Sequence, residues 1–267
     1  MTPPVESARL KSCCANAYES DFAGRLLGDS FHPGGLHLTM RLGKLLDLYP
    51  GSRVLDVASG KGESAIFLAQ RFGCQVTGVD FGKDNVAAAS ARATTAGVAH
   101  LVSFLQGDAE VLEFPDAGFD AVMCECAFCT FPDKPAAARE FARVLRGGGK
   151  AGLSDLTRSG PLPSQMEGLL AWIACIADAR PAQEYMAYLE EAGLRVIAHE
   201  PRDEALAAMV RDIQGKLMGV EMMTRLGKLD LPGADFELAR QFARAAAAAV
   251  RDGLLGYSLL VAEQPCS

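Results

Sequence analysis

From Arg53 to Leu156 the sequence alternates short apolar segments with longer amphipathic ones, and short turns join them. The apolar segments have the length and composition of buried strands, and the amphipathic segments have helical periodicity. We predict strands at Arg53–Val57, Cys74–Val79, Val102–Leu105, Phe119–Cys124 and Lys150–Leu156. We predict helices at Ser64–Phe72, Asp84–Thr95 and Pro135–Leu145, the last capped by the glycines at 147–149. Such alternation predicts an α/β fold with a doubly wound, mostly parallel sheet.

The flanking segments extend this domain, because no repeat, linker or low-complexity block separates them from it. We predict further helices at Leu36–Leu48, Ser164–Ala179, Gln183–Ala192 and within 203–252, and strands at Leu194–His199 and Gly256–Glu263. The expected division is an N-terminal cysteine-containing cap or lid at 1–50, a cofactor-binding core at 51–200, and a helical insertion with the closing strand at 201–267.

The charge balance restricts the partners that this chain can bind. Lys and Arg number 26 against 33 Asp and Glu, which gives a net charge of −7. A nucleic-acid partner is not expected, because phosphate binding needs basic patches. No apolar run reaches the roughly 18–20 residues that span a bilayer, and the first ten residues lack an apolar signal core. We therefore expect a cytoplasmic protein with no membrane partner, and the sequence leaves its oligomeric state open.

The turn after the first predicted strand is rich in glycine. It contains Ala58, Gly60 and Gly62 and leads into the helix that begins near Ser64. Glycine has no Cβ atom, so the backbone of this turn can approach a bound ligand closely. The spacing matches neither G-x-G-x-x-G of dinucleotide-binding folds nor G-K-[ST] of phosphate-binding loops. In a doubly wound sheet the turn lies at the carboxyl ends of the strands, where ligands bind.

The stretch from Asp56 to Gly62 resembles the first motif of class I S-adenosylmethionine-dependent methyltransferases, D/E-x-G-x-G-x-G, with Ala58 in place of the first glycine. The resemblance implies a Rossmann-like fold with S-adenosylmethionine as cofactor. It also implies that Asp80 accepts hydrogen bonds from the ribose hydroxyls and that Asp108 and Ala109 lie at the adenine. The cofactor contacts implied in full are Asp56, Ala58, Gly60, Gly62, Asp80, Phe81, Asp108, Ala109 and Cys124. The alternative is an NAD-binding fold that uses Asp80 for its ribose.

The sequence has eight cysteines, an unusual number for a protein with no export signal. A cytosolic protein keeps its thiols reduced, so clustered cysteines there are ligands or redox-active groups more often than disulfides. Isolated cysteines are usually inert core residues. We expect Cys74 to be a core residue and Cys266 to have no role. Cys124 is expected to pack inside the fourth strand, and Cys129 is equally compatible with packing and with a spare thiol.

The stretch from Cys124 to Lys134 resembles the corresponding segment of arsenite methyltransferases, and so does the stretch from Leu170 to Ile176. The resemblance covers roughly residues 13–195 and places Cys126 and Cys175 on two arsenic-binding cysteines, with Glu125 in place of an asparagine. It implies that Cys13 and Cys14 are further thiols of the substrate site. The implied catalytic residues are Cys126, Cys175, Cys13 and Cys14, and the implied arsenic ligands are Cys126, Cys175 and Cys14.

The implied chemistry suits these residue types. Trivalent arsenic is soft and prefers thiolate ligands, and its binding drives the loss of the thiol protons. The arsenic lone pair would then attack the sulfonium methyl directly, in a reaction that needs no general base. Holding the two groups in line is worth up to roughly 7–11 kcal/mol in favourable cases. The expected role is metalloid detoxification, on arsenite or methylarsenite that arrives free or as a thiol conjugate, with a cellular thiol reductant as partner.

Three alternatives remain open from the sequence. In the first, the chain is a methyltransferase for an organic small molecule, its cysteines are structural, and residues 203–252 form a substrate lid. In the second, it is a thiol-based metalloid-binding protein without turnover. The spacing of Cys124, Cys126 and Cys129 also resembles a zinc site, but it lacks the second distant pair of a structural zinc centre. His32 and His37 belong either to a helix start or to a lid over the cofactor.

Overall fold

The computed structural model describes residues 32–163, 166, 176–231 and 235–266. Its centre is a seven-stranded sheet in the order β3-β2-β1-β4-β5-β7-β6. The strands are β1 (Arg53–Val57), β2 (Gln75–Asp80), β3 (Val102–Gln106), β4 (Phe119–Glu125), β5 (Leu145–Arg158), β6 (Arg195–Pro201) and β7 (Leu255–Glu263). Neighbouring strands from β3 to β5 are parallel, and β7 runs antiparallel to both β5 and β6. The doubly wound, mostly parallel sheet predicted from the sequence is therefore confirmed.

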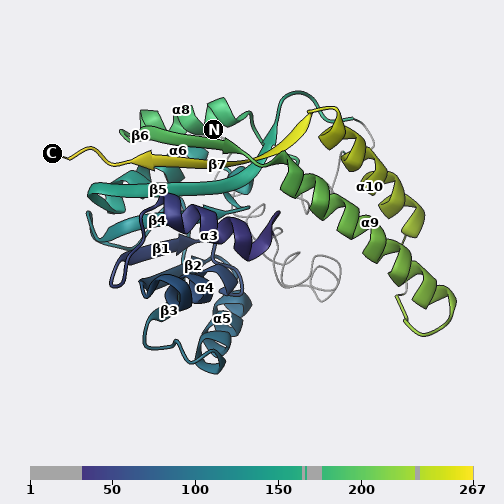
Figure 1. The fold of residues 1–267 in the computed structure, drawn as a ribbon, viewed down its shortest axis with the longest axis horizontal. Coiled ribbons are helices and arrows are strands. Elements are labelled where there is room, and N and C mark those ends of the chain that lie inside the picture. The colour runs from purple at the N-terminus through teal and green to yellow at the C-terminus, as the bar shows by residue number, and fades with distance from the viewer. Residues whose placement is uncertain (1–31, 164–165, 167–175, 232–234, 267) are drawn as a thin grey trace.

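Helices cover both faces of the sheet (Figure 1). They are α3 (Gly35–Leu45), α4 (Glu63–Phe72), α5 (Lys83–Thr95), α6 (Lys134–Val144) and α8 (Ala182–Glu191). One apolar cluster packs α3, α4 and α5 against the sheet, and a second packs α6 and α8 against the opposite face. Burying apolar side chains on both faces is the main favourable contribution to the stability of this arrangement.

A pair of helices separates the last two strands of the chain. They are α9 (Asp203–Arg225) and α10 (Phe236–Arg251), which pack against each other and extend away from the sheet (Figure 1). The helical content expected for 203–252 is thus confirmed. Within the described part of the chain, none of the helices has the length and apolarity needed to cross a membrane.

Two predictions about elements were wrong. The glycines at 147–149 do not cap α6, because that helix ends at Val144 and the chain enters β5 at Leu145. Hydrogen bonds to the neighbouring strands satisfy this glycine backbone, as when Gln264 donates to the carbonyl of Gly149 over 2.8 Å. Residues 176–179 form a turn and not the end of a helix, and 164–165 and 167–175 lie outside the described residues.

The strand order reverses between β1 and β4, which lead in the chain to opposite sides of the sheet. In a doubly wound sheet, the loops after two such strands diverge, and ligands bind at the carboxyl ends between them. This edge carries the glycine turn after β1, Asp80 at the end of β2 and Glu125 at the end of β4. The candidate site is therefore built here.

Candidate active site

The turn between β1 and α4 brings bare backbone to this edge. Ala58, Gly60 and Gly62 have positive φ angles of 59°, 52° and 78°. A Cβ atom at Gly62 would lie 2.5 Å from Cζ of Phe104, so only glycine fits there. The N–H of Ser59 donates to the carbonyl of Val79 over 3.0 Å and holds the turn against β2. A ligand can thus approach the backbone of this turn closely, as the sequence predicted.

Ala58 occupies a backbone conformation that favours glycine. The left-handed region costs an L-residue with a Cβ atom roughly 1–2 kcal/mol, and glycine regains most of this despite its greater freedom when unfolded. We expect Ala58→Gly to raise the free energy of unfolding by about 1 kcal/mol, measured by urea denaturation. Ala87→Gly, on the exposed side of α5, is the matched control and should lower it by about 1 kcal/mol. If both variants change the free energy of unfolding in the same direction, the assignment of backbone strain to Ala58 is contradicted.

Asp80 joins the turn after β1 to the turn after β2. Its Oδ2 accepts from the N–H of Gly60 over 2.8 Å, and its Oδ1 accepts from Gly82 N–H over 2.8 Å and from Asn85 Nδ2 over 3.1 Å. A carboxylate offers about four acceptor positions, so these three bonds leave one on Oδ2. The Asp80 side chain is thus held rigidly with capacity for one further donor.

The predicted adenine side lies beside the next strand. Because β2 and β3 pair with Asp80 opposite Gln106, the segments after both strands start from the same edge. Phe81 is exposed, while Asp108 and Ala109 are half-buried. The Oδ1 of Asp108 accepts from the N–H of Glu110 over 3.0 Å, which fixes this carboxylate in a turn. The geometry brings these residues to the edge that holds Asp80, and their contacts with a cofactor remain predictions.

Two further carboxylates lie buried beneath the turn. Asp56 is 2% exposed, and burial raises its pKa well above the ordinary value, with Glu125 and Asp80 raising it further. Asp56 Oδ2, Ser59 Oγ and Glu125 Oε1 are buried, and none has a hydrogen-bond partner among the residues described. Buried polar atoms usually have partners, and unpaired ones concentrate at functional sites. This cluster would suit a ligand that carries positive charge and N–H donors.

Glu125 also connects α3 to the cofactor edge. Its Oε2 accepts from Thr39 Oγ1 of α3 over 3.0 Å and from Ser64 Oγ of α4 over 2.6 Å. His32 is buried, with its Nε2 3.4 Å from Thr39 Oγ1 and 3.6 Å from Glu125 Oε2. The sequence pointed to Glu125 and His32 but not to Thr39 or Ser64. No spacing signal marks these two, because each reaches Glu125 from another helix.

The cysteines around β4 do not gather as one cluster. Cys124 is completely buried in the core, as predicted, and Cys129, for which the sequence left packing and a spare thiol open, is buried there as well. Burial also raises the pKa of the Cys124 thiol well above its ordinary value, and nearby Asp155 and Asp56 add to this. The thiol of Cys124 thus faces the core, which leaves only its backbone for the predicted cofactor contact.

Cys126 is less buried than Cys124 and Cys129. It follows the end of β4, is half-buried, and has a positive φ of 53°, which is rare for a residue with a side chain. Its N–H donates to the carbonyl of Ser154 over 2.7 Å. Burial raises the pKa of Tyr257 well above its usual range, and the neighbouring Cys126 and Glu125 raise it further. Cys126 and Glu125 thus both lie near this phenol.

Other predicted ligands cannot be placed. Cys13, Cys14 and Cys175 lie outside the described residues, as does Trp172. Among the residues that are described, no three His, Cys, Asp or Glu side chains come together as a metal site would require. The described cysteines also include Cys74, which is buried in the core, and Cys266, which is exposed near the C-terminus.

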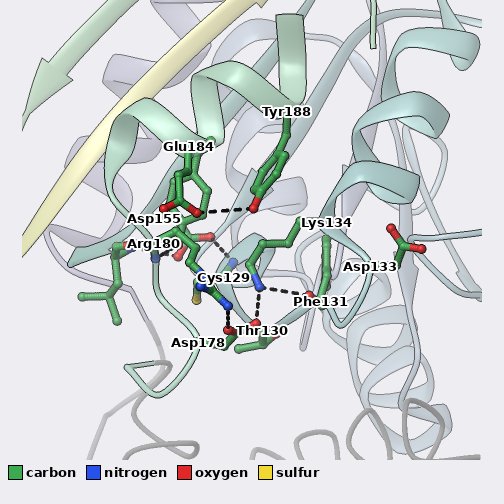
Figure 2. Close-up of polar contacts among 12 residues, drawn as sticks. Cys129, Thr130, Phe131, Asp133, Lys134, Asp155, Asp178, Arg180, Glu184 and Tyr188 are labelled. Atoms are coloured by element: carbon green, nitrogen blue, oxygen red, sulfur yellow. Dashed lines mark hydrogen bonds and ion pairs between the residues drawn. The ribbon is translucent and has the colours of Figure 1, made fainter. Parts of the chain in front are cut away.

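A network of charged side chains, of which Lys134 and Asp155 are buried, holds the segment that follows Cys126 (Figure 2). Asp155 of β5 accepts from the N–H of Cys129 over 3.0 Å. Lys134 is buried, donates to the carbonyl of Phe131 over 3.0 Å and pairs with Asp178, which also pairs with Arg180. These contacts tie the short helix η1 (Phe128–Thr130) to the segment before α8. The sequence marked Lys134 only as part of a resemblance and did not reveal this network.

Comparisons with known proteins agree with this geometry. The sequence model of a family described as "Methyltransferase domain" matches residues 55–153, which include the glycine turn, Asp80 and Glu125. The 27-O-demethylrifamycin SV methyltransferase of Amycolatopsis mediterranei (strain S699) is 34% identical over 191 residues, covering 66% of this chain and 70% of that protein. Phosphoethanolamine N-methyltransferase 3 of Arabidopsis thaliana is 31% identical over 211 residues, 78% of this chain but only 41% of the plant enzyme.

A solved structure shares the fold at lower sequence identity. Haemonchus contortus phosphoethanolamine N-methyltransferase 2, in complex with phosphomonomethylethanolamine and S-adenosylhomocysteine, superimposes with a TM-score of 0.80 at 20% identity. The match covers 96% of this chain and 60% of that protein. None of these three similar proteins is named for arsenic.

Proposed function

The chain belongs to the class I S-adenosylmethionine-dependent methyltransferases, and we propose that it methylates a hydroxyl group of a small organic molecule. The observation that carries the choice of acceptor is the chain of contacts from Glu125 through Thr39 to His32. The name of the Amycolatopsis relative also refers to an O-demethylated molecule.

The residues at the edge of the sheet fit the cofactor. Bound S-adenosylmethionine supplies a methyl group on a positively charged sulfur, which a nucleophile attacks. Asp80 has one acceptor position left for a ribose hydroxyl, and Asp108 and Ala109 would border the adenine. The turn at 58–62 would pass beneath the ligand with its bare backbone. The buried carboxylates of Asp56 and Glu125 would balance the positive charge.

The contacts of His32 assign its protons. Thr39 has one hydroxyl proton, which it donates to Glu125 Oε2, so its oxygen accepts at the contact with His32 Nε2. Nε2 then carries the ring proton, and Nδ1 is left as a proton acceptor. This Nδ1 is buried and has no hydrogen-bond partner among the described residues. A histidine held in this tautomer presents Nδ1 as the proton acceptor that general base catalysis needs.

His32 would act on the hydroxyl as the new bond forms. The bound cofactor would supply the methyl group to the acceptor oxygen, and His32 Nδ1 would accept the proton that this hydroxyl loses. Thr39 and Glu125 hold the ring in place and stabilise the positive charge that it gains. An arsenic nucleophile has no proton to lose, so it would leave this base without a role.

We expect His32→Gln to lower kcat by about 10²- to 10⁴-fold and to change cofactor affinity less than threefold. The measurement uses methyl-labelled S-adenosylmethionine with a panel of phenolic and aliphatic alcohols, phosphoethanolamine, and arsenite with a thiol reductant. His37→Gln is the matched control, because His37 is exposed in the first turn of α3, which His32 precedes. The proposal fails if only the amine or arsenite is methylated, or if His32→Gln turns over hydroxyl acceptors as fast as the parent.

Arsenite remains the second candidate acceptor because of Cys126. Its half-buried thiol lies at the cofactor edge in a left-handed backbone conformation, and such conformations concentrate at functional sites. The arsenic ligands would be Cys126, Cys175 and Cys14, with Cys13 as a further thiol. The burial of Cys124 and Cys129 argues against a larger thiolate cluster from the same segment.

Arsenic speciation after incubation with arsenite, a thiol reductant and S-adenosylmethionine tests this candidate. If arsenic is the substrate, we expect methylated arsenic from the parent and a loss of at least 100-fold in Cys126→Ser and Cys175→Ser. Cys74→Ser is the control, because Cys74 is buried in the core on the face of α4 and α5. Absence of methylated arsenic, or equal rates for all three variants, would remove arsenic as the acceptor.

A further inference from the structure

The two carboxylate oxygens of Glu125 have different surroundings. The Glu125 side chain is 4% exposed, although Glu125 is the last residue of β4 and lies at the cofactor edge of the sheet. Oε2 accepts two hydrogen bonds, from Thr39 and Ser64, which hold the carboxylate from two helices. Oε1 is buried as well and has no hydrogen-bond partner among the residues that the structure describes. An acceptor that is buried and unpaired destabilises the protein unless a ligand supplies the donor.

Two other oxygen atoms without hydrogen-bond partners in the described part of the chain come from the end of β1 and the turn after it. Asp56 precedes the glycine turn by two residues on β1, the neighbour of β4, and its Oδ2 is buried without a described partner. Ser59 Oγ, inside the turn, is also buried and has no hydrogen-bond partner among the described residues. The proximity of Glu125 is one reason that the pKa of Asp56 is raised, so the two carboxyl groups repel each other when both are ionised. A small cation with several N–H donors would satisfy this group of atoms.

We propose that Glu125 is the residue that recognises the α-ammonium group of S-adenosylmethionine, through its Oε1. The cofactor of this family carries one primary ammonium, a compact charge with three donors. A carboxylate with one free oxygen, already oriented through the other, is suited to bind it. The inference rests on cofactor use alone and is independent of whether the acceptor is a hydroxyl or arsenic.

The pair of hydroxyl donors makes Glu125→Gln an informative substitution. Thr39 and Ser64 both donate to the Oε2 position, so the amide oxygen of glutamine must take that place. The amide NH₂ then occupies the position of Oε1 and directs its donors at the ammonium. The substitution therefore preserves shape and both anchoring bonds while it reverses the polarity of the proposed contact.

The test is calorimetric binding of two ligands, S-adenosylhomocysteine and its desamino analogue, which keeps the carboxylate and lacks the ammonium. We expect the parent to bind the desamino analogue about 50-fold more weakly. Glu125→Gln should lose about 50-fold for S-adenosylhomocysteine and discriminate less than threefold between the ligands. Glu237→Gln, on the exposed helix α10, is the matched control and should behave like the parent.

Two results would overturn the proposal. One is equal affinity of the parent for both ligands, which needs no variant and so does not depend on folding. The other is a folded Glu125→Gln protein, with a parental melting temperature, that keeps the full preference for S-adenosylhomocysteine. Neither result bears on the acceptor, because no methyl transfer is measured.

Discussion

Replacing Asp80 with asparagine is expected to weaken S-adenosylhomocysteine binding by about 10²- to 10³-fold. The carboxylate accepts from Gly60, Gly82 and Asn85, and the asparagine NH₂ cannot accept from any of them. At least one buried N–H donor then lacks a partner, at a cost of roughly 1–3 kcal/mol. The charge-assisted bond that we propose from Asp80 to the ribose would be lost in addition, and such bonds contribute about 1.5–3 kcal/mol.

Isothermal titration calorimetry measures this effect directly. The matched control is Asp84→Asn, because Asp84 is an exposed carboxylate in the first turn of α5. Its affinity should stay within threefold of the parent. A change of less than fivefold in Asp80→Asn would show that this carboxylate organises the two turns without binding the ribose.

Replacing Gly62 with alanine is expected to lower the free energy of unfolding by about 2–5 kcal/mol. Its φ of 78° is unfavourable for any residue with a Cβ atom and accounts for roughly 1–2 kcal/mol. The new Cβ would lie 2.5 Å from Cζ of Phe104 and 2.9 Å from Cβ of Ala89, so the turn or α5 must move. Overpacking of this kind costs typically 1–3 kcal/mol. Urea denaturation followed by circular dichroism measures the loss.

Gly60→Ala separates the two contributions to this loss. Gly60 also has a positive φ, of 52°, but a Cβ atom there would meet nothing within 4 Å. We expect this variant to lose only about 1–2 kcal/mol. Adding Phe104→Leu should partly rescue Gly62→Ala and not Gly60→Ala. Equal losses for the two alanine variants would show that backbone strain alone decides the stability of the turn.

The local pattern of the sequence was sufficient to predict the sheet. The strand at Arg53–Val57 was predicted at its observed bounds, because every residue after Arg53 is buried and three of these four residues are apolar. The glycines at 147–149 misled the prediction, since glycine caps helices and also occurs in strands. Their pairing depends on β4 and on Gln264, far away in the sequence.

The parts of the candidate site that lie within one short segment of the sequence could be predicted from it. The glycine turn and Asp80 follow strands that can be read from the sequence, and parallel strands place their carboxyl ends at one edge. The role of Glu125 was not predictable in the same way. The residue was noted only because it departs from a resemblance, whereas its partners Thr39 and Ser64 come from other helices.

By itself, the sequence determined the strand–helix alternation, the glycine turn and the acidic residue after β2, because each depends on contacts within a few neighbouring residues. Only the tertiary structure decided which polar groups meet. The packing of α3 on the sheet brings His32 within 3.6 Å of Glu125, 93 positions later in the chain. It also decided that Cys124 and Cys129 are fully buried in the core while Cys126, beyond the end of β4, is only half-buried at its border. Burial and pairing depend on the neighbours that a side chain acquires on folding, and no spacing in the sequence encodes them.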